Sequence, residues 1–287
     1  MVRTAAALLL LSSACAPDDG WAWVDVDDTA CANGRPTGFG LRPGEGEDLV
    51  IYLMGGGACW DAATCYGLQT AWNVSTGYTR ETFAAEARRS AGIFEPFSNA
   101  THVYVPYCTG DLHAGTATRE HLAGTKTHHV GANNLDAVLA RLDAPRGRVF
   151  VVGTSAGGYG AQLNAARFVA RFEGHEVHVL ADSAPLVADD KLEGWKATWG
   201  ATDQSALPQG SRLGLVASRR DWLISSFVGL SPEQYEAKLL ELVATRFDAP
   251  PARMALVVDG NQHVFFDAAG LPGVNDFVER WRDGVMP

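Results

Sequence analysis

The stretch Arg148–Phe168, R-V-F-V-V-G-T-S-A-G-G-Y-G-A-Q-L-N-A-A-R-F, decides the fold. Val149–Val152 is a short β-branched apolar run, typical of a buried strand, and the residues from Ala156 onward favour a helix. Between them, G-T-S-A-G at 153–157 is a G-x-S-x-G sequence in the strand–turn–helix context of a nucleophile elbow. Side chains at 153 and 157 would collide with the neighbouring strand and helix, so only glycine fits the tight turn that exposes the Ser155 hydroxyl. The alternative is a glycine-rich turn in which Ser155 merely caps the helix.

Composition places the chain among ordinary globular proteins. Its 287 residues are 47% hydrophobic, enough for one large domain with a sizeable core. Acidic residues number 33 and basic residues 23, giving a net charge of −10. No basic stripe is present, which argues against a nucleic-acid partner. No phosphate-binding loop or dinucleotide fingerprint occurs, and we expect neither a cofactor nor a metal.

The first residues read as a targeting segment. Arg3 supplies a positive start, and Ala5–Leu11 is an apolar run too short to span a bilayer. We expect residues 1–14 to be a signal peptide of the lipoprotein type, with Cys15 as the lipidated first residue of a single domain, 15–287. Ordinary secretory cleavage is the alternative. Either way the protein is expected to be exported, as a membrane-anchored lipoprotein or as a secreted or periplasmic protein, and to meet a membrane only through that anchor.

Four cysteines remain once Cys15 is set aside, and export permits disulfides. They are Cys31, Cys59, Cys65 and Cys108, and they allow three pairings. Cys59 and Cys65 are close in the chain and bracket a loop, which favours 59–65 with 31–108. A four-cysteine zinc site is the weaker alternative, because the spacings are irregular.

Strand and helix patterns alternate along the chain. Strands are expected at 21–26, 37–41, 48–54, 102–106, 149–152, 176–180, 213–217 and 254–258. Helices are expected at 79–91, 130–142, 156–172, 232–247 and 274–282. Such alternation predicts an α/β fold, with a mostly parallel sheet covered by helices on both faces. Asp189–Gln209, with two tryptophans, is expected to form a small cap or insertion.

A serine nucleophile needs a histidine base, which a carboxylate orients. In α/β-hydrolases these follow in the order serine, acid, histidine. Of eight histidines, His263 alone lies beyond every plausible acid, and it follows the last strand, at the edge where ligands bind. Asp221, after the second strand beyond the elbow, is favoured as the acid. Asp182 and Asp259 are the alternatives, Asp182 being expected to form a wall or brace a loop.

An oxyanion hole needs backbone N–H groups directed at the developing charge. Ala156, after the nucleophile, is one expected donor. Gly55, Gly56 and Gly57 end the strand at 48–54, and this run of three glycines allows backbone to approach a substrate closely. A plain tight turn is the alternative reading of this run.

Five motifs together resemble the pectin acetylesterases and the related Notum carboxylesterases. They are M-G-G-G-A-C at 54–59 followed by Cys65, Y-C-T-G-D at 107–111, the elbow at 153–158, A-D-S-A at 181–184, and R-D-W at 220–222. The resemblance spans residues 31 to 265 with gaps. It implies Ser155, Asp221 and His263 as a triad, with Gly55, Gly56 and Ala156 around the oxyanion.

The chain departs from the family where substrate would bind. Ala58 replaces an aromatic residue, Met54 replaces an acidic one, and Thr109 replaces an aspartate. The type of reaction therefore carries over better than the substrate.

The sequence thus predicts an exported serine carboxylesterase that removes O-acetyl groups from a carbohydrate such as pectin through an acyl-enzyme. The alternatives are a lipid or fatty-acyl esterase and a non-catalytic, surface glycan-binding lipoprotein. His121, His128 and His129 are more typical of a solvated loop than of a metal site. Trp195, Trp199 and Trp222 fit either sugar stacking or packing of the cap.

Overall fold

The computed structural model describes residues 20–86, 91–187, 190–202, 204–266 and 273–285. The predicted signal peptide, 1–14, and the predicted lipidation site, Cys15, lie outside the described residues. None of the described helices combines the length and the apolar character that crossing a membrane requires.

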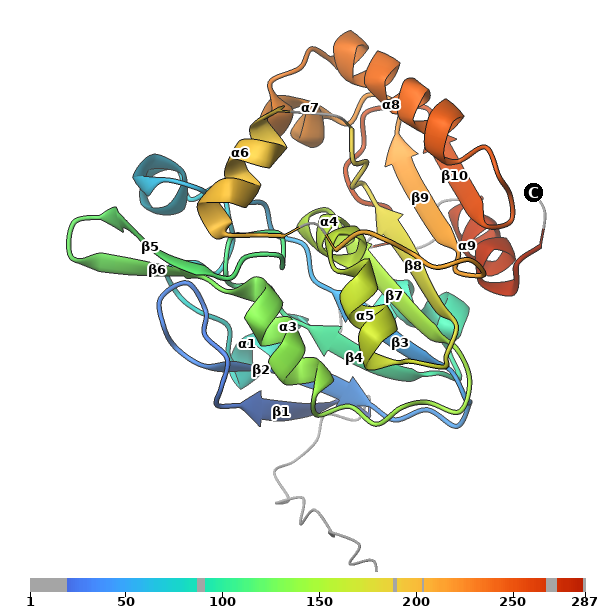
Figure 1. Cartoon of the computed structure of the whole chain (residues 1–287), viewed down its shortest axis with the longest axis horizontal. Helices are drawn as coiled ribbons and strands as arrows, with labels where there is room; N and C mark the ends of the chain where they lie inside the picture. The colour runs from blue at the N-terminus through green and yellow to red at the C-terminus, as the bar shows by residue number, and fades with distance from the viewer. Residues whose placement is uncertain (1–19, 87–90, 188–189, 203, 267–272, 286–287) are drawn as a thin grey trace, which may run out of the picture.

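A sheet with the order β1-β2-β4-β3-β7-β8-β9-β10 forms the centre of the molecule (Figure 1). Its strands are β1 (Ala22–Val26), β2 (Thr37–Arg42), β3 (Leu49–Leu53), β4 (Thr101–Val105), β7 (Val149–Thr154), β8 (Val177–Asp182), β9 (Leu213–Ser218) and β10 (Arg253–Val258). The six strands from β4 to β10 in this order are parallel, and β2 runs antiparallel to both of its neighbours. Every residue of β3, β7, β8 and β9 is buried, as parallel strands with both faces covered require.

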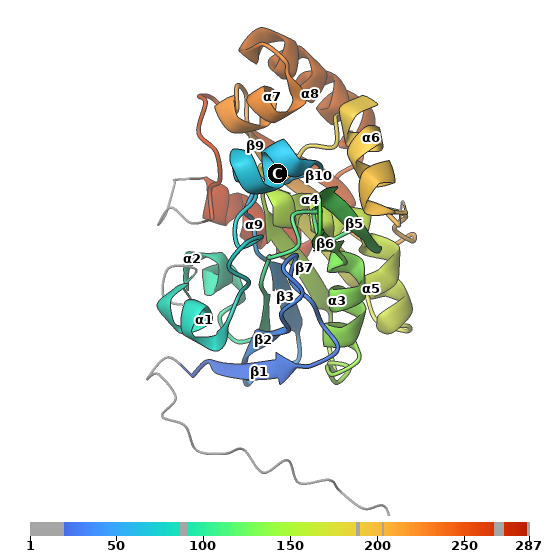
Figure 2. The same ribbon diagram turned by 90° about the vertical axis from the view of Figure 1, so that its left-hand side faces the viewer.

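Helices lie on both faces of this sheet. They are α1 (Arg80–Glu86), α2 (Ala91–Phe94), α3 (Gly131–Leu139), α4 (Ala156–Leu163), α5 (Ala165–Arg171), α6 (Asp190–Trp199), α7 (Trp222–Val228), α8 (Pro232–Arg246) and α9 (Val274–Asp283). Figure 2 shows α1, α2 and α9 on one side of the sheet and α3 and α5 on the other. Helices α6, α7 and α8 lie beyond the carboxyl ends of β8 and β9, at the top of Figure 1. The predicted α/β architecture is confirmed, with α6 as the expected cap.

Two disulfides join the cysteine pairs that the sequence favoured. Cys31 is bonded to Cys108, and Cys59 to Cys65. All four side chains are buried. Cys59–Cys65 lies in the loop after β3, just past the glycine run, and Cys31–Cys108 joins the β1–β2 connection to the loop after β4.

Three local elements differ from the prediction. The helix expected at 156–172 breaks at Asn164, whose side-chain amide donates to the carbonyls of Gly160 and His113. A hairpin of β5 (Ala117–Leu122) and β6 (Thr125–His129) forms where no strand was expected, because its mostly polar residues give no apolar alternation. Helix α7 was also missed, since it spans only seven residues.

Candidate active site

Ser155 sits on the predicted sharp turn between β7 and α4, with φ +51° and ψ −120°. A Cβ at Gly157 would lie 1.9 Å from the Leu53 carbonyl oxygen, and one at Gly153 would lie 2.2 Å from the Gly157 carbonyl oxygen. Both positions therefore require glycine, as the sequence argument held. The Ser155 N–H donates to the carbonyl of Asp182 at 2.8 Å. This bond ties the turn to the end of β8.

His263 lies between Ser155 and Asp221 and bonds to both. Its Nε2 is 2.9 Å from the Ser155 Oγ, and its Nδ1 is 2.7 Å from the Asp221 Oδ2. A carboxylate only accepts, so Nδ1 carries the hydrogen and Nε2 is left to accept from the serine hydroxyl. Asp221, the acid that the sequence favoured, thus lies within hydrogen-bonding reach of His263.

Asp221 is fully buried, and both of its oxygens have partners. Oδ1 accepts the backbone N–H groups of Leu223 and Ile224, each at 3.0 Å, as the N-cap of α7. Oδ2 is left for His263. The start of α7 thus fixes the carboxylate while it faces the imidazole, and the N-terminal end of a helix favours a negative charge.

Asp182 holds the backbone beside His263 rather than the imidazole. Its Oδ2 accepts the N–H groups of Phe265 and Phe266 at 2.7 and 3.0 Å. Its Oδ1 accepts the Ser183 hydroxyl, whose oxygen in turn accepts the N–H of Val264. Complete burial raises the pKa of Asp182 to about 6, although these donors and His263 oppose the shift. Asp182 therefore braces the His263 loop, as expected of it in the sequence.

Asp259, the third candidate acid, is directed away from the site. Its carboxylate pairs with Arg219 at 2.7 Å, and its side chain is 89% exposed. Asp259 and His263 lie on the same turn, but their side chains point in different directions. Asp259 is therefore not the acid that orients the imidazole of His263.

The run of glycines after β3 borders an open cleft that also reaches Ser155 and His263. The cleft has a volume of about 850 Å³, and Gly55, Gly56 and Gly57 all line it. Gly56 and Gly57 have φ of +143° and +75°, which a side chain would strain. Trp72 forms part of the same wall and is 64% exposed.

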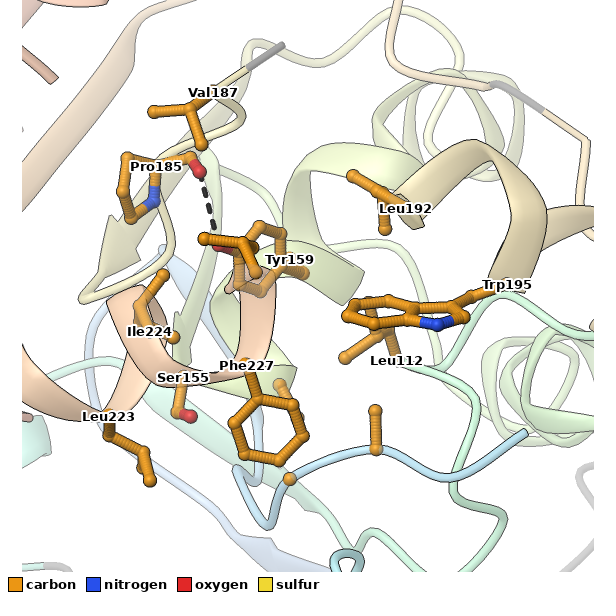
Figure 3. A pocket seen from close by; sticks show the side chains of 14 residues that line it. Leu112, Ser155, Tyr159, Pro185, Val187, Leu192, Trp195, Leu223, Ile224 and Phe227 are labelled. Atoms are coloured by element: carbon orange, nitrogen blue, oxygen red, sulfur yellow. Dashed lines mark hydrogen bonds between the residues drawn. The ribbon is translucent and has the colours of Figure 1, made fainter. Parts of the chain in front are cut away.

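A second, smaller pocket adjoins Ser155 on the side of the cap, and Figure 3 shows its lining. Its volume is about 40 Å³, and its walls are apolar side chains from α6, α7 and the 185–187 segment. Trp195 and Phe227 face the pocket from opposite helices (Figure 3). Trp195 stacks on Trp60 with ring centroids 4.3 Å apart, so an aromatic wall limits the pocket on that side.

Gly57, Ala58 and Ala156 line this smaller pocket together with Ser155. Gly57 also lines the open cleft, so it lies where the two spaces meet at the serine. The sequence pointed to the whole run of three glycines, and the family resemblance implied Gly55 and Gly56, because three equivalent glycines in a row give no local signal of which one faces the nucleophile.

The prediction that the hairpin histidines are solvated is wrong for His129. Its side chain is buried, its Nδ1 is 2.8 Å from the Thr109 carbonyl oxygen, and its Nε2 is 2.8 Å from the Nε2 of His121. Burial lowers the pKa of His129 to about 4. Ligand atoms of Cys59, Cys65 and His129 lie within 4.8 Å of one another, but the two sulfurs are bonded together and are not thiolates able to bind a metal.

The three tryptophans singled out in the sequence have three different environments. Trp199 is fully buried and donates its indole N–H to the Cys59 carbonyl at 2.8 Å. Trp195 lines the smaller pocket beside Ser155. Trp222 is 58% exposed, directly after Asp221. Packing therefore accounts for Trp199, whereas Trp222 lies free at the surface near the site.

The profile of the pectinacetylesterase family matches residues 22–199. That is more than half of the chain. The chain belongs to the pectinacetylesterase family. The match includes Ser155 and the glycine run, whereas Asp221 and His263 lie beyond it. The family resemblance drawn from the five motifs is thereby confirmed.

Two curated relatives are similar to part of this family member. The palmitoleoyl-protein carboxylesterase NOTUM of Drosophila melanogaster is 31% identical over 153 residues, which cover 48% of this chain and 22% of the relative. The palmitoleoyl-protein carboxylesterase notum2 of Xenopus laevis is 29% identical over 158 residues, covering 50% of this chain and 31% of the relative. The chain thus matches less than a third of the length of these relatives.

Solved structures of the Wnt deacylase Notum from Drosophila share the fold. One crystal form superposes with a TM-score of 0.64 at 18% identity, covering 93% of this chain and 95% of that one. A second form gives 0.60 at 16% identity, covering 88% and 87%. The protein therefore has the α/β-hydrolase fold of these structures.

Proposed function

We propose that this pectinacetylesterase-family protein is a serine carboxylesterase in which Ser155, Asp221 and His263 act as a catalytic triad. One observation carries the proposal: Ser155, His263 and Asp221 form a continuous hydrogen-bonded chain through the two imidazole nitrogens, at 2.9 and 2.7 Å. The strained turn at Ser155 supports it, since strain of this kind persists at functional sites.

The reaction follows the acyl-enzyme route. The Ser155 oxygen attacks the ester carbonyl carbon while its proton passes to the His263 Nε2. Asp221 stabilises the imidazolium through Nδ1. Collapse of the tetrahedral intermediate breaks the bond to the alcohol oxygen, which leaves with the proton from His263. Water then gives a proton to His263, its oxygen attacks the acyl carbon, and the acid is released as Ser155 regains its hydrogen.

The oxyanion would be held by backbone N–H groups of Ala156 and of the glycine run. The sequence nominates Gly55 and Gly56. Gly57 joins them here because it borders both spaces at Ser155. Hydrogen bonds from such donors stabilise an oxyanion more strongly in a site with little water than in bulk water. Ser155 is only 7% exposed, so its surroundings hold little water.

The acyl group is proposed to be short, with acetyl favoured. A water-sized group occupies about 10–15 Å³ of such a space, so the smaller pocket, of about 40 Å³, has room for only a few non-hydrogen atoms. A long fatty chain is the second candidate, because the curated relatives are named for palmitoleoyl-protein esters. The aromatic side chain of Trp195, which lines the smaller pocket and stacks on Trp60, weighs against it.

The alcohol is proposed to be a carbohydrate lying in the open cleft. The exposed face of Trp72 offers a surface for a sugar ring, and Gln69, Thr70 and Glu86 supply polar groups along the same wall. A pectin-like substrate is consistent with the family name. Two buried disulfides support export, while the lipid anchor at Cys15 remains part of the proposal.

Replacing the nucleophile tests the proposal directly. Ser155→Ala is expected to lower hydrolysis of 4-nitrophenyl acetate to below about a hundredth of wild type, because no other group forms the acyl-enzyme. A fluorophosphonate probe should label wild type and not this variant. Ser225→Ala is the matched control, since Ser225 is also buried but bonds to the Trp222 carbonyl. Equal labelling of Ser155→Ala would reject the assignment and point to another nucleophile, whereas a wild-type protein that neither labels nor hydrolyses the ester would favour a non-catalytic glycan-binding protein.

An acyl-length series tests the substrate. With 4-nitrophenyl esters from acetyl to palmitoyl, kcat/KM is expected to fall by at least about 100-fold beyond butyryl, because longer chains meet the pocket wall. Trp195→Ala should move the cut-off to longer chains, whereas Trp222→Ala, outside this pocket, should not. A palmitoyl ester turned over as well as the acetyl ester would identify the fatty-acyl alternative instead.

A further inference from the structure

A buried turn, Tyr107–His113, packs against the run of glycines at 55–57. The proposed mechanism gives this turn no role. It follows β4, and its Tyr107, Asp111 and His113 are almost fully buried. Leu112 and His113 both adopt left-handed backbone conformations, with φ of +55° and +57°. Adjacent non-glycine residues in this region are held there only when the surroundings require it. The contacts that this turn makes with its surroundings therefore keep it in its strained conformation.

The turn contacts the glycine run at both ends and in the middle. At the start, the His113 Nε2 is 2.9 Å from the Met54 carbonyl oxygen. In the middle, a Cβ on Gly56 would lie 3.0 Å from the Tyr107 ring. At the end, the Cys59 N–H donates to the Gly110 carbonyl at 2.9 Å. The run from Met54 to Cys59 thus rests on this turn along its whole length.

The bond from His113 has a specific geometric consequence. The Met54 carbonyl and the Gly55 N–H belong to one planar peptide unit. Fixing the direction of the carbonyl therefore fixes the direction of that N–H and the path by which the glycine run leaves β3. A carbonyl oxygen can only accept, so His113 Nε2 carries the hydrogen. Burial lowers the pKa of His113, although the bond to Met54 and the charge of Asp111 oppose the shift, so the neutral ring is favoured.

The same turn also contacts the helix that carries the nucleophile. The Asn164 side-chain amide donates to the His113 carbonyl at 3.0 Å, and a Cβ on Gly160 of α4 would lie 2.9 Å from the His113 Cβ. His113 therefore lies between α4, which begins after Ser155, and the strand end that begins the glycine run. It is placed to set the distance between nucleophile and oxyanion donors.

We propose that His113 is a positioning residue for ester hydrolysis: its Nε2–H bond to Met54 holds the glycine run in register with Ser155. The inference rests on the proposed function but concerns a residue outside the triad and the oxyanion donors. Small displacements of such donors cost turnover more than substrate binding, because the charge on the oxyanion develops only in the transition state. The expected signature is a fall in kcat with little change in KM.

Asparagine and glutamine replacements separate the bond from the bulk of the ring. Asparagine tolerates the left-handed backbone, but its amide is too short to reach Met54. Glutamine extends one methylene further and carries an N–H near the position of the His113 Nε2. H113N is expected to lower kcat for 4-nitrophenyl acetate by about 10- to 100-fold with KM within about twofold, and H113Q to recover most of this loss.

His102 provides the matched control. It is also a buried histidine whose Nε2 bonds to a carbonyl oxygen, that of Phe97, at 2.8 Å, but that carbonyl is not in the glycine run. H102N should lower the midpoint of urea unfolding and leave kcat within about twofold of wild type. Affinity for a trifluoromethyl ketone, which forms an oxyanion on Ser155, should fall in H113N and not in H102N.

Each outcome decides the inference. If H113N and H102N lose the same small amount of kcat, or if H113Q fails to recover turnover, His113 is only structural and the inference is wrong while the esterase proposal stands. If H113N does not fold, H113Q is decisive by itself, since a tenfold loss of kcat in a folded H113Q would also overturn it. Absence of ester hydrolysis in the wild-type protein would overturn both proposals.

Discussion

Two buried carboxylates end neighbouring strands at the same edge of the sheet, yet they act on different parts of one loop. Asp182 ends β8 and accepts backbone N–H groups of Phe265 and Phe266. Asp221 follows β9 and accepts the Nδ1–H of His263. Strands β9 and β10 are parallel neighbours, which brings the loop after β9 beside the imidazole. Asp182, one strand further away, reaches the backbone that follows it.

The comparison shows that burial and proximity do not by themselves identify a triad acid. Both side chains are fully buried and both lie next to the histidine loop. What separates them is the atom each one contacts, which follows from strand order and from the helix that Asp221 caps. Asp182 also holds Val264 in a left-handed conformation, φ +69°, through Ser183. For a β-branched residue this is unusual, so the loop needs its brace.

The largest expected effect comes from Asp221. Asp221→Asn should lower kcat by about three to four orders of magnitude while the protein stays folded, because the wrong histidine tautomer then faces Ser155. Steady-state kinetics with 4-nitrophenyl acetate and a circular dichroism spectrum would measure both. Turnover within tenfold of wild type would mean that Asp221 does not orient His263.

A smaller effect is expected from Asp182. In Asp182→Asn, the amide oxygen can still accept the two backbone N–H groups. The amide N–H, however, takes the place of the oxygen that accepts the Ser183 hydroxyl, so two donors face each other. One unsatisfied buried donor costs about 1–3 kcal/mol of unfolding free energy, and kcat should fall by about tenfold or less. Urea unfolding and kinetics on the same preparation would test this. A loss of turnover as large as that of Asp221→Asn would show that Asp182 acts on the charge of His263.

The effect expected to be smallest on turnover is a pH dependence of stability. The pKa of Asp182 is about 6 in the folded protein, against an ordinary value of 3.8, so the folded state binds the proton more tightly between these values. Its contribution to stability is therefore fully present below about pH 4 and lost as pH rises through 6, a change of roughly 3 kcal/mol. Urea unfolding of wild type and Asp182→Asn at pH 4.5, 5.5 and 7 should converge as pH rises. Parallel profiles would contradict the raised pKa.

Much of the fold was readable because its signals are local. The buried strands β3, β7, β8 and β9 are mostly continuous apolar runs. The glycines of the elbow are required by close contacts within the turn and with the adjacent strand. The disulfide pairs followed from loop spacing. The hairpin of β5 and β6 was not predicted, because most of its residues are polar and partly exposed. The burial of His129, which lies on this hairpin, was therefore not predicted either.

The order of residues along the chain determined which serine, acid and histidine meet, because parallel strands deliver their following loops to one edge of the sheet. Tertiary structure alone decided which atoms they contact. The bond from His113 to Met54 joins residues 59 positions apart, and the smaller pocket beside Ser155 is assembled from α6, α7 and loops of separate strands. Such contacts depend on how distant surfaces pack, which no local pattern of residues encodes.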